Sequence, residues 1–162
     1  DRLNVVASEE LLARFPVAPG CSMEVAGEIR SFNNKSGQGS RLVITVYART
    51  LSPCDEPHEN LVSLSGTLCK PPNLRRTPLG RDICDIMLAV NRRYGRADYL
   101  PCIAWGALAR RCGAFQVGDA VRLRGRLQSR TYTKQLPEGA EIRTAFEVSV
   151  MELDPLTPAF GS

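Results

Sequence analysis

The sequence has few of the residues on which hydrolytic active sites and membrane segments are commonly built. Among its 162 residues there is one histidine, His58, and aromatic residues make up only 6%. No apolar run approaches the roughly 20 residues of a membrane-spanning helix, and the first residues do not show the charged, apolar and small-residue order of a signal peptide. We therefore expect a cytoplasmic protein that is neither a membrane protein nor an enzyme.

The six cysteines do not have the spacing of a metal site. No two of them form a C-x-x-C pair. Cys54 and His58 lie four residues apart, but a zinc ion needs two further ligands that the sequence does not identify. We expect reduced thiols, with Cys84 and Cys102 acting as small buried hydrophobic residues in strands. We expect no metal and no cofactor.

Positive charge is concentrated in one part of the chain. The formal net charge is only +4, but residues 60–153 hold 15 Lys and Arg against 8 Asp and Glu, a local balance of +7. The remainder holds 6 against 9, a balance of −3. Such an asymmetry favours a polyanion as partner, although a basic domain without such a partner would carry the same charge.

Hydrophobic residues make up 43% of the sequence, which predicts a packed core. Residues 61–68 and 83–90 alternate between apolar and polar side chains, as half-buried strands do. The segment between them is rich in proline and glycine and predicts a turn. It carries four cations, which are either an anion-binding cluster or, more ordinarily, a solvated loop: Lys70, Arg75, Arg76 and Arg81.

Five strands and one helix are expected within residues 60–153. After the first two strands come a basic loop at 91–97, a third strand at 98–104, a short helix at 107–112, a fourth strand at 121–127, a loop at 130–140 and a fifth strand around 146–150. Three strands, a helix and two strands are the order of the OB-fold, a small five-stranded Greek-key barrel. The sequence therefore predicts an all-β OB-fold with one short helix.

An internal repeat organises the rest of the chain. GCSMEVAGEIRSF at residues 20–32 parallels GDAVRLRGRLQSR at 118–130, at a constant offset of 98 residues that matches Gly27 with Gly125. Ser8 predicts a helix N-cap before the first copy, as a helix precedes the second. Residues 1–52 are thus interpreted as the C-terminal half of an OB-like unit whose first three strands are missing from this chain.

We expect four segments: a partial OB-like unit at 1–52, a linker at 53–59, a complete OB-fold at 60–153 and a tail at 154–162. The partial unit leaves an apolar face and unpaired strand edges, which invite pairing. We expect that face to pack against the complete barrel or a second copy, or against missing strands that stay bound. Its apolar residues are Val25, Ile29, Ile44 and Val46.

Several motifs in residues 60–153 together resemble the bacterial single-stranded DNA-binding protein family. They are the G-x-L opening, the L-R-x-T-P-x-G hairpin, the L-A-V-N-R strand end and the G-R-L-x-S-R hairpin. The resemblance implies sequence-independent binding of single-stranded DNA in replication, repair or recombination. It also implies a homo-oligomer, a dimer or a tetramer.

The resemblance further implies which side chains meet DNA. Bases would stack on aromatic rings, which tolerate any base because every base has a π-face, and cations would neutralise phosphates. The matching aromatic positions are Tyr94, Tyr99, Trp105 and Tyr132. The matching cations are Arg75, Arg92, Arg93, Arg130 and Lys134, together with Arg122 and Arg126.

A second function stays open. Leu61 stands where the family has a basic residue, Tyr99-Leu100-Pro101 replaces a W-H-R-like segment, and the part of the chain outside residues 60–153 has a net charge of −3. These features are consistent with an OB-fold protein-interaction or scaffold module that binds DNA weakly or not at all.

Overall fold

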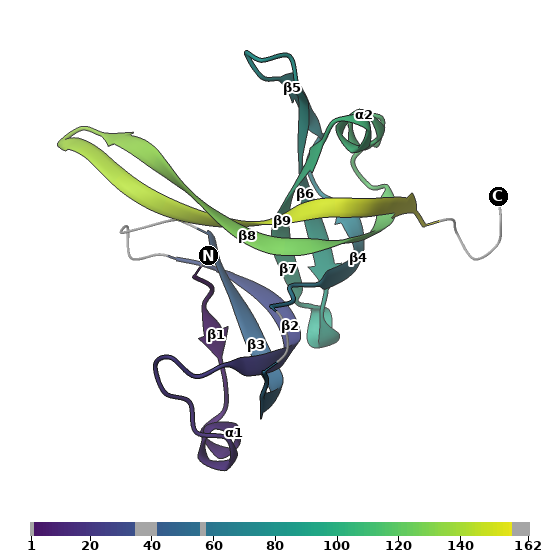
Figure 1. The fold of residues 1–162 in the computed structure, drawn as a ribbon. Coiled ribbons are helices and arrows are strands. Elements are labelled where there is room, and N and C mark those ends of the chain that lie inside the picture. Colours follow the sequence, from purple (N-terminus) through teal and green to yellow (C-terminus); the bar gives the residue numbers. More distant parts are fainter. Residues whose placement is uncertain (1, 35–41, 56–57, 157–162) are drawn as a thin grey trace.

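The computed structural model describes residues 2–34, 42–55 and 58–156. Strands dominate, and they form two sheets that lie against each other (Figure 1). One sheet has three strands in the order β1-β3-β2. The other has six in the order β4-β8-β9-β7-β6-β5, with an additional pairing of β4 with β6. No helix in the described segments is long and apolar enough to cross a membrane.

The first sheet contains one short helix between its strands. Its elements are β1 (Val5–Val6), α1 (Glu9–Arg14), β2 (Met23–Asn33) and β3 (Leu42–Pro53). The helix begins as the sequence predicts, because the Ser8 hydroxyl accepts a hydrogen bond from the Leu11 N–H at 3.1 Å. Strand β2 pairs antiparallel with β3, and β1 adds to β3 in parallel.

The second sheet closes on itself. Its elements are β4 (Val62–Leu68), β5 (Asn73–Arg76), β6 (Asp82–Asn91), the 3-10 turn η1 (Arg93–Gly95), β7 (Ala97–Trp105), α2 (Ala107–Gly113), β8 (Ala120–Leu136) and β9 (Gly139–Pro155). Strand β4 pairs with both β8 and β6, while β7 pairs with β6 and runs parallel to β9. These pairings complete a five-stranded ring, so the all-β OB-fold expected from the sequence is confirmed.

The core lies inside this ring. Alternate residues of each strand point inward and are almost fully buried, among them Leu68, Leu88, Leu100 and Leu123. The cysteines predicted to be buried in strands, Cys84 and Cys102, belong to this core. Helix α2 places Cys112 against it, and burial raises the pKa of that thiol to about 12, so it stays protonated at neutral pH.

Two segments expected to be loops form strands instead. Asn73–Arg76 pairs with residues 82–85 and makes β5, so the turn is confined to residues 77–81. There the Thr77 N–H donates to the Arg81 carbonyl at 2.8 Å. Residues 130–136 and 139–146 extend β8 and β9 into one long hairpin, which includes most of the loop expected at 130–140. The sequence does not reveal these strands, because their exposed side chains are mostly polar and lack the apolar alternation that identifies a strand.

The expected tail is likewise shorter than predicted. Strand β9 continues to Pro155, and its residue Asp154 pairs with Arg122. Residues 157–162 lie outside the described part of the chain.

The internal repeat has the same local build in both sheets. A β-bulge follows Ala26 in β2 and Arg124 in β8, immediately before Gly27 and Gly125. A Cβ on Gly27 would collide with the Tyr47 carbonyl oxygen, and one on Gly125 with the Ser149 carbonyl oxygen. The parallel pair β1–β3 likewise corresponds to β7–β9. Two glycines that are 98 residues apart thus allow the same close approach of two backbones.

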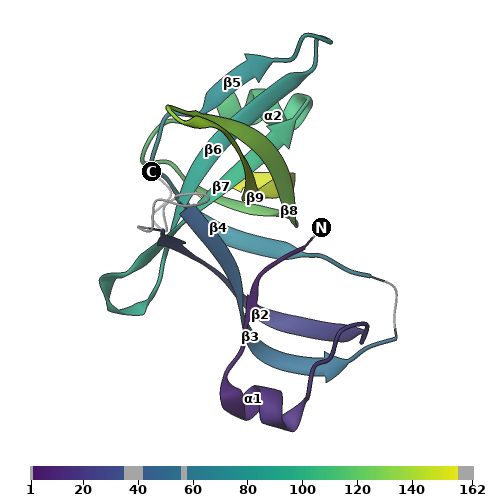
Figure 2. The ribbon, with the colours of Figure 1, turned by 90° about the vertical axis from the view of Figure 1, so that its left-hand side faces the viewer.

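The first sheet packs on the barrel, as expected from its apolar face. Ile44 is 3% exposed and joins the barrel's core cluster, while Ile29 and Val46 pack against it. The two sheets meet at an angle (Figure 2). Val25 remains 36% exposed, although its counterpart Leu123 is buried, so part of the apolar face stays open.

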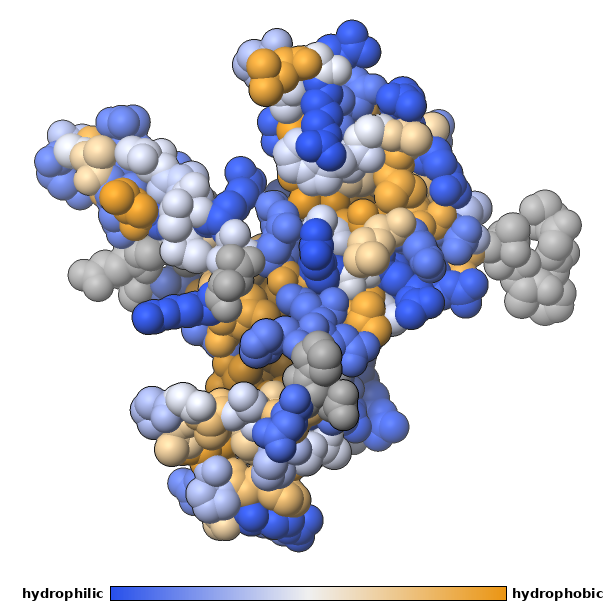
Figure 3. All heavy atoms as spheres, in the orientation of Figure 1, coloured by the Kyte–Doolittle hydropathy of each residue, from blue (hydrophilic) through white to orange (hydrophobic). Residues whose placement is uncertain are grey.

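A hollow of about 1250 Å³ lies where this face is open. Its lining includes Leu3 before β1, Val25 and Val46 from the first sheet, and Val62 and Tyr94 from the barrel. Hydrophobic atoms reach the surface between the two sheets (Figure 3).

The bulge glycine of the barrel gives a test of the fold. Gly125→Ala is expected to destabilise the protein by about 1–3 kcal/mol, since the added methyl meets a backbone oxygen that cannot move without disturbing β9. Urea unfolding followed by circular dichroism measures this. Thr133→Ala, an exposed position on the same strand, is the control and should stay within about 0.5 kcal/mol. Equal stability of the two variants would contradict the close approach.

Candidate nucleic-acid interface

Strand β7 presents two of the four expected aromatic residues on the outside of the barrel. Its residues Leu100, Cys102 and Ala104 belong to the core, so Tyr99 and Trp105, at odd positions, face outward. Tyr99 is exposed and Trp105 is half-buried. They lie six residues apart on one strand, which corresponds to about 20 Å. We call the outward side of β6 and β7 the outer face.

Trp105 lies at the end of the outer face that adjoins the β5–β6 hairpin. Its cross-strand neighbour is Ile83, and the neighbour of Ile83 on β5 is Arg75. The guanidinium carbon of Arg81 lies 4.7 Å from the centre of the Trp105 ring. This cation–π contact covers one face of the ring and explains why Trp105 is neither a core residue nor fully exposed.

Carboxylates hold the arginines at this end. Asp82 accepts hydrogen bonds from Arg110 at 2.7 Å and from Arg76 at 3.2 Å. Both bonds lower the pKa of Asp82, and the bond from Arg110 has the larger effect. The stabilisation that Asp82 provides is therefore present above its ordinary pKa and lost as the pH falls through the lowered value. Arg75 pairs with Asp85 at 3.0 Å.

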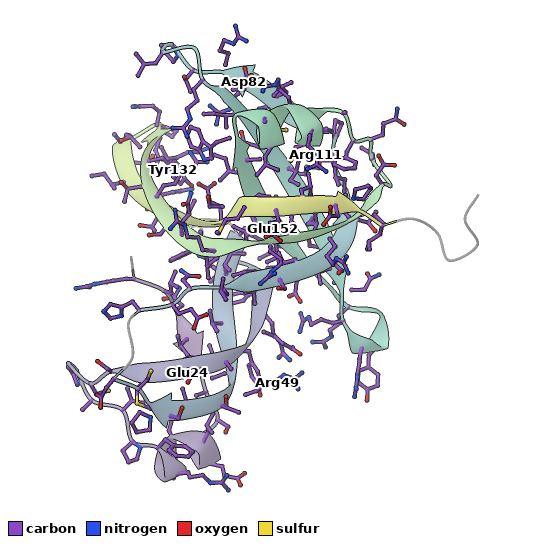
Figure 4. The ribbon with its side chains drawn as sticks, turned by 45° about the vertical axis from the view of Figure 1, so that its right-hand side comes forward. Glu24, Arg49, Asp82, Arg111, Tyr132 and Glu152 are labelled. Carbon is purple, nitrogen blue, oxygen red and sulfur yellow. The ribbon has the colours of Figure 1, made fainter. Side chains whose placement is uncertain are left out.

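The β8–β9 hairpin projects from the barrel beside the outer face, and a gap separates it from the β5–β6 hairpin in the space-filling view (Figures 1 and 3). Tyr132 lies on this hairpin (Figure 4), half-buried on a strand rather than in the expected loop. Lys134 is exposed near the hairpin's tip. Arg130 lies between them and the barrel and pairs with Glu147 at 3.3 Å.

Arg143 is a candidate that the sequence did not reveal. It is the cross-strand neighbour of Tyr132, is 9% exposed, and contacts Glu141 at 3.2 Å. Its Nε is buried without a hydrogen-bond partner among the described residues. Only the register of the hairpin identifies it, because Arg143 belongs to no motif and its partner Tyr132 is expected in a loop.

Two arginines of β8 that the sequence treats alike lie in different surroundings. Arg126 is the neighbour of Ser149 on β9, which is the neighbour of Ile103 on the outer side of β7. Arg126 thus continues the outer face. Arg122 instead lies between Ser65 of β4 and Asp154 of β9. The structure therefore brings Arg126, but not Arg122, to the outer face.

Tyr94 lies at the other end of β6 and β7, in the loop that joins them. Its ring is 96% exposed. Arg93 beside it is exposed, whereas Arg92 is half-buried and its Nε lies 2.8 Å from Oδ2 of Asp98. The loop therefore presents one aromatic ring and two exposed cations, Arg93 and Arg96, to solvent.

The expected site residues form three separate groups. They are the outer face with Arg75, Tyr99, Trp105 and Arg126, the hairpin with Arg130, Tyr132 and Lys134, and the loop with Arg92, Arg93 and Tyr94. Exposed rings among cations suit a flexible chain that carries flat groups and negative charges. In the part of the chain that the structure describes, no three His, Cys, Asp or Glu side chains gather as a metal site.

The contact between Arg81 and Trp105 gives a test that needs no ligand. Arg81→Ala should uncover the indole ring and increase the quenching of tryptophan fluorescence by acrylamide, and Trp105 is the single tryptophan. Stability should change by only about 0.5–1 kcal/mol, as for an exposed cation–π pair. Arg93→Ala, which removes an exposed arginine from the other loop, is the control and should leave quenching unchanged. Unchanged quenching in both variants would refute the stacking.

Curated relatives match the barrel. Single-stranded DNA-binding protein 2 of Listeria innocua is 32% identical over 110 residues, which cover 64% of this chain and 69% of that protein. Single-stranded DNA-binding protein A of Bacillus subtilis is 34% identical over 103 residues, covering 59% of this chain and 60% of that protein. Protein B of the same organism is 32% identical over 103 residues, covering 59% of this chain and 91% of that protein.

A solved structure matches more of the chain. Wild-type single-stranded DNA binding protein from Thermus aquaticus superposes with a TM-score of 0.67 at 25% identity, covering 85% of this chain and 60% of that one. That coverage exceeds the share of the barrel, so the structural likeness extends into the first sheet. The family model of the single-strand binding protein family matches residues 59–156, more than half of the chain, and the protein therefore belongs to the single-strand binding protein family.

Proposed function

We propose that the chain binds single-stranded DNA without sequence preference, in replication, repair or recombination, and acts by binding rather than by catalysis. The observation that carries the proposal is the outer face of β6 and β7, with Tyr99 and Trp105 on it and a basic hairpin at each side. In OB-folds, oligonucleotides bind this face between the hairpins that correspond to β5–β6 and β8–β9. The relatives' names support the same ligand.

Affinity is divided between stacking and charge. Each base that stacks on an exposed ring contributes about 1–3 kcal/mol and is accepted whatever its sequence. Each phosphate that meets a cation releases a counterion, which makes binding depend on salt. Rings spaced along β7, on the hairpin and in the β6–β7 loop suit successive bases of an extended strand.

The predicted cations differ in whether a carboxylate already pairs with them. Arg75, Arg92 and Arg130 already have carboxylate partners, so a phosphate must replace a carboxylate or share the guanidinium with it. Arg93, Arg126 and Lys134 have no ion-pair partner among the described residues. We expect these three to contribute most to the salt dependence.

The division of the chain is part of the proposal. We assign DNA binding mainly to residues 60–153 and treat residues 1–52 as a partial OB-like unit joined to the barrel by the linker at 53–59. We also propose that the chain forms a homo-oligomer, a dimer or a tetramer, and that it is located in the cytoplasm. Light scattering coupled to size-exclusion chromatography measures the assembly.

A second candidate function rests on the hollow between the sheets. Its lining combines apolar side chains with arginines and carboxylates, and with the exposed Leu61 it is typical of surfaces that bind protein. A scaffold module would form a stable protein complex while oligo-dT shows no retention in a gel shift.

Trp105 provides the direct test of DNA binding. Titration with oligo-dT should quench its fluorescence, because a base contacts the ring or the Arg81 guanidinium that lies over it. The affinity should fall steeply between low and high salt. An oligonucleotide duplex of the same length is the control and should bind more weakly. Absence of quenching and of gel-shift retention at low salt would remove the proposal.

The two arginines of β8 provide a matched pair of variants. Arg126→Ala should weaken oligo-dT binding and reduce the slope of log affinity against log salt by about 0.7, the value for one phosphate contact with a single strand. Arg122→Ala removes the same charge from the same strand, but away from the outer face, and should leave the slope nearly unchanged. Equal effects would mean that net charge, rather than position, governs binding.

A further inference from the structure

The first sheet is tied to the barrel by two reciprocal hydrogen bonds. The backbone N–H of Ser31 in β2 donates to Oδ1 of Asp98 at 2.8 Å, and the backbone N–H of Tyr99 donates to the Ser31 hydroxyl at 2.7 Å. Ser31 and Asp98 are 7% and 2% exposed. Because buried polar groups that lose a partner are costly, these bonds hold β2 firmly against the start of β7.

Asp98 has a second partner on the opposite side of its carboxylate. Its Oδ2 lies 2.8 Å from Nε of Arg92. A carboxylate that is so deeply buried requires a positive charge beside it. Arg92 begins the β6–β7 loop. Its backbone N–H donates to the Arg96 carbonyl at 2.7 Å, and this bond closes the loop. One buried carboxylate therefore joins the first sheet to the base of this loop.

Tyr94 occupies the tip of the loop in an unfavourable conformation. Its φ of 65° and ψ of 33° are left-handed, and no other described residue except glycine has a positive φ. Tyr94 is 96% exposed, so side-chain packing does not hold the residue there. Strain at an exposed aromatic residue is typical of positions that the surrounding structure keeps ready for a ligand. The ion pair between Arg92 and Asp98 is the contact that fixes the base of this loop.

We infer that Asp98 and Ser31 are positioning residues for Tyr94. Through them the first sheet sets the direction of an aromatic ring that meets a DNA base, without needing to touch DNA itself. The inference rests on the proposed function, because it assumes that Tyr94 stacks on a base. It gives residues 1–52, to which the proposed function assigns no direct contact with DNA, a role in binding.

Two substitutions separate the two halves of this link. Asp98→Asn keeps an oxygen for the Ser31 N–H and removes the charge that holds Arg92. Ser31→Ala removes the hydroxyl that accepts from Tyr99 and leaves the pair of Asp98 and Arg92 intact. Each is measured for oligo-dT affinity twice, in the natural background and together with Tyr94→Ala.

With Tyr94 present, each substitution should weaken binding about threefold to tenfold. In the Tyr94→Ala background the same substitutions should change affinity by less than about 1.5-fold, because there is no ring left to misplace. A general loss of structure would instead lower affinity equally in both backgrounds. This difference distinguishes positioning from stability.

Asp119→Asn is the control for the chemical change. Asp119 accepts a hydrogen bond from the Gln116 N–H at 2.8 Å in the turn before β8, and has no link to Tyr94. Its effect on affinity should be the same with and without Tyr94. Circular dichroism of every variant confirms folding, and Ser31→Ala carries the test should Asp98→Asn fail to fold.

The outcomes separate the two proposals. If the natural protein binds oligo-dT and the effects of Asp98→Asn and Ser31→Ala are nil or equal in both backgrounds, the positioning role is overturned and DNA binding stands. If the natural protein does not bind oligo-dT, both proposals fall.

Discussion

Closure of the barrel is the constraint on which the other features depend. Strand β4 pairs with β8 on one side and with β6 on the other, so five strands form a ring with an inside and an outside. Alternate side chains must then fill the core or stand on the surface. Tyr99 and Trp105 reach the outer face because Leu100 and Ala104 are needed inside. The ring also leaves two hairpins projecting beside that face.

Opposite charges within the site are a second constraint. Arg75, Arg92 and Arg130 each lie against a carboxylate, which limits mutual repulsion among cations and orients their guanidinium groups. The same carboxylates compete with phosphate, so that the basic surface is neither as strong nor as indiscriminate as its net charge suggests. The salt dependence of binding then comes mainly from the cations without a carboxylate partner. The paired cations instead fix the geometry of the site.

The two sheets share their construction but not their surroundings. Gly27 and Gly125 permit the same backbone approach, yet Leu123 is buried where Val25 remains partly open. The difference arises because β4 covers β8, whereas no described strand covers the corresponding edge of β2. The first sheet obtains part of its stability from the barrel instead, through Ile44 and the hydrogen bonds of Ser31.

The sequence by itself determined the order of the five barrel strands and the helix, the burial of Cys84 and Cys102, the repeat that matches Gly27 with Gly125, and the family resemblance. These follow from alternation, caps and short motifs, which act over a few residues. Only the tertiary structure decided that residues 130–136 continue a strand, that Arg126 and not Arg122 adjoins the outer face, and that Arg143 lies beside Tyr132. It also joined Ser31 to Asp98 across 67 residues. Such contacts depend on strand register and on closure of the ring, and no local pattern in the chain encodes which distant polar groups will meet.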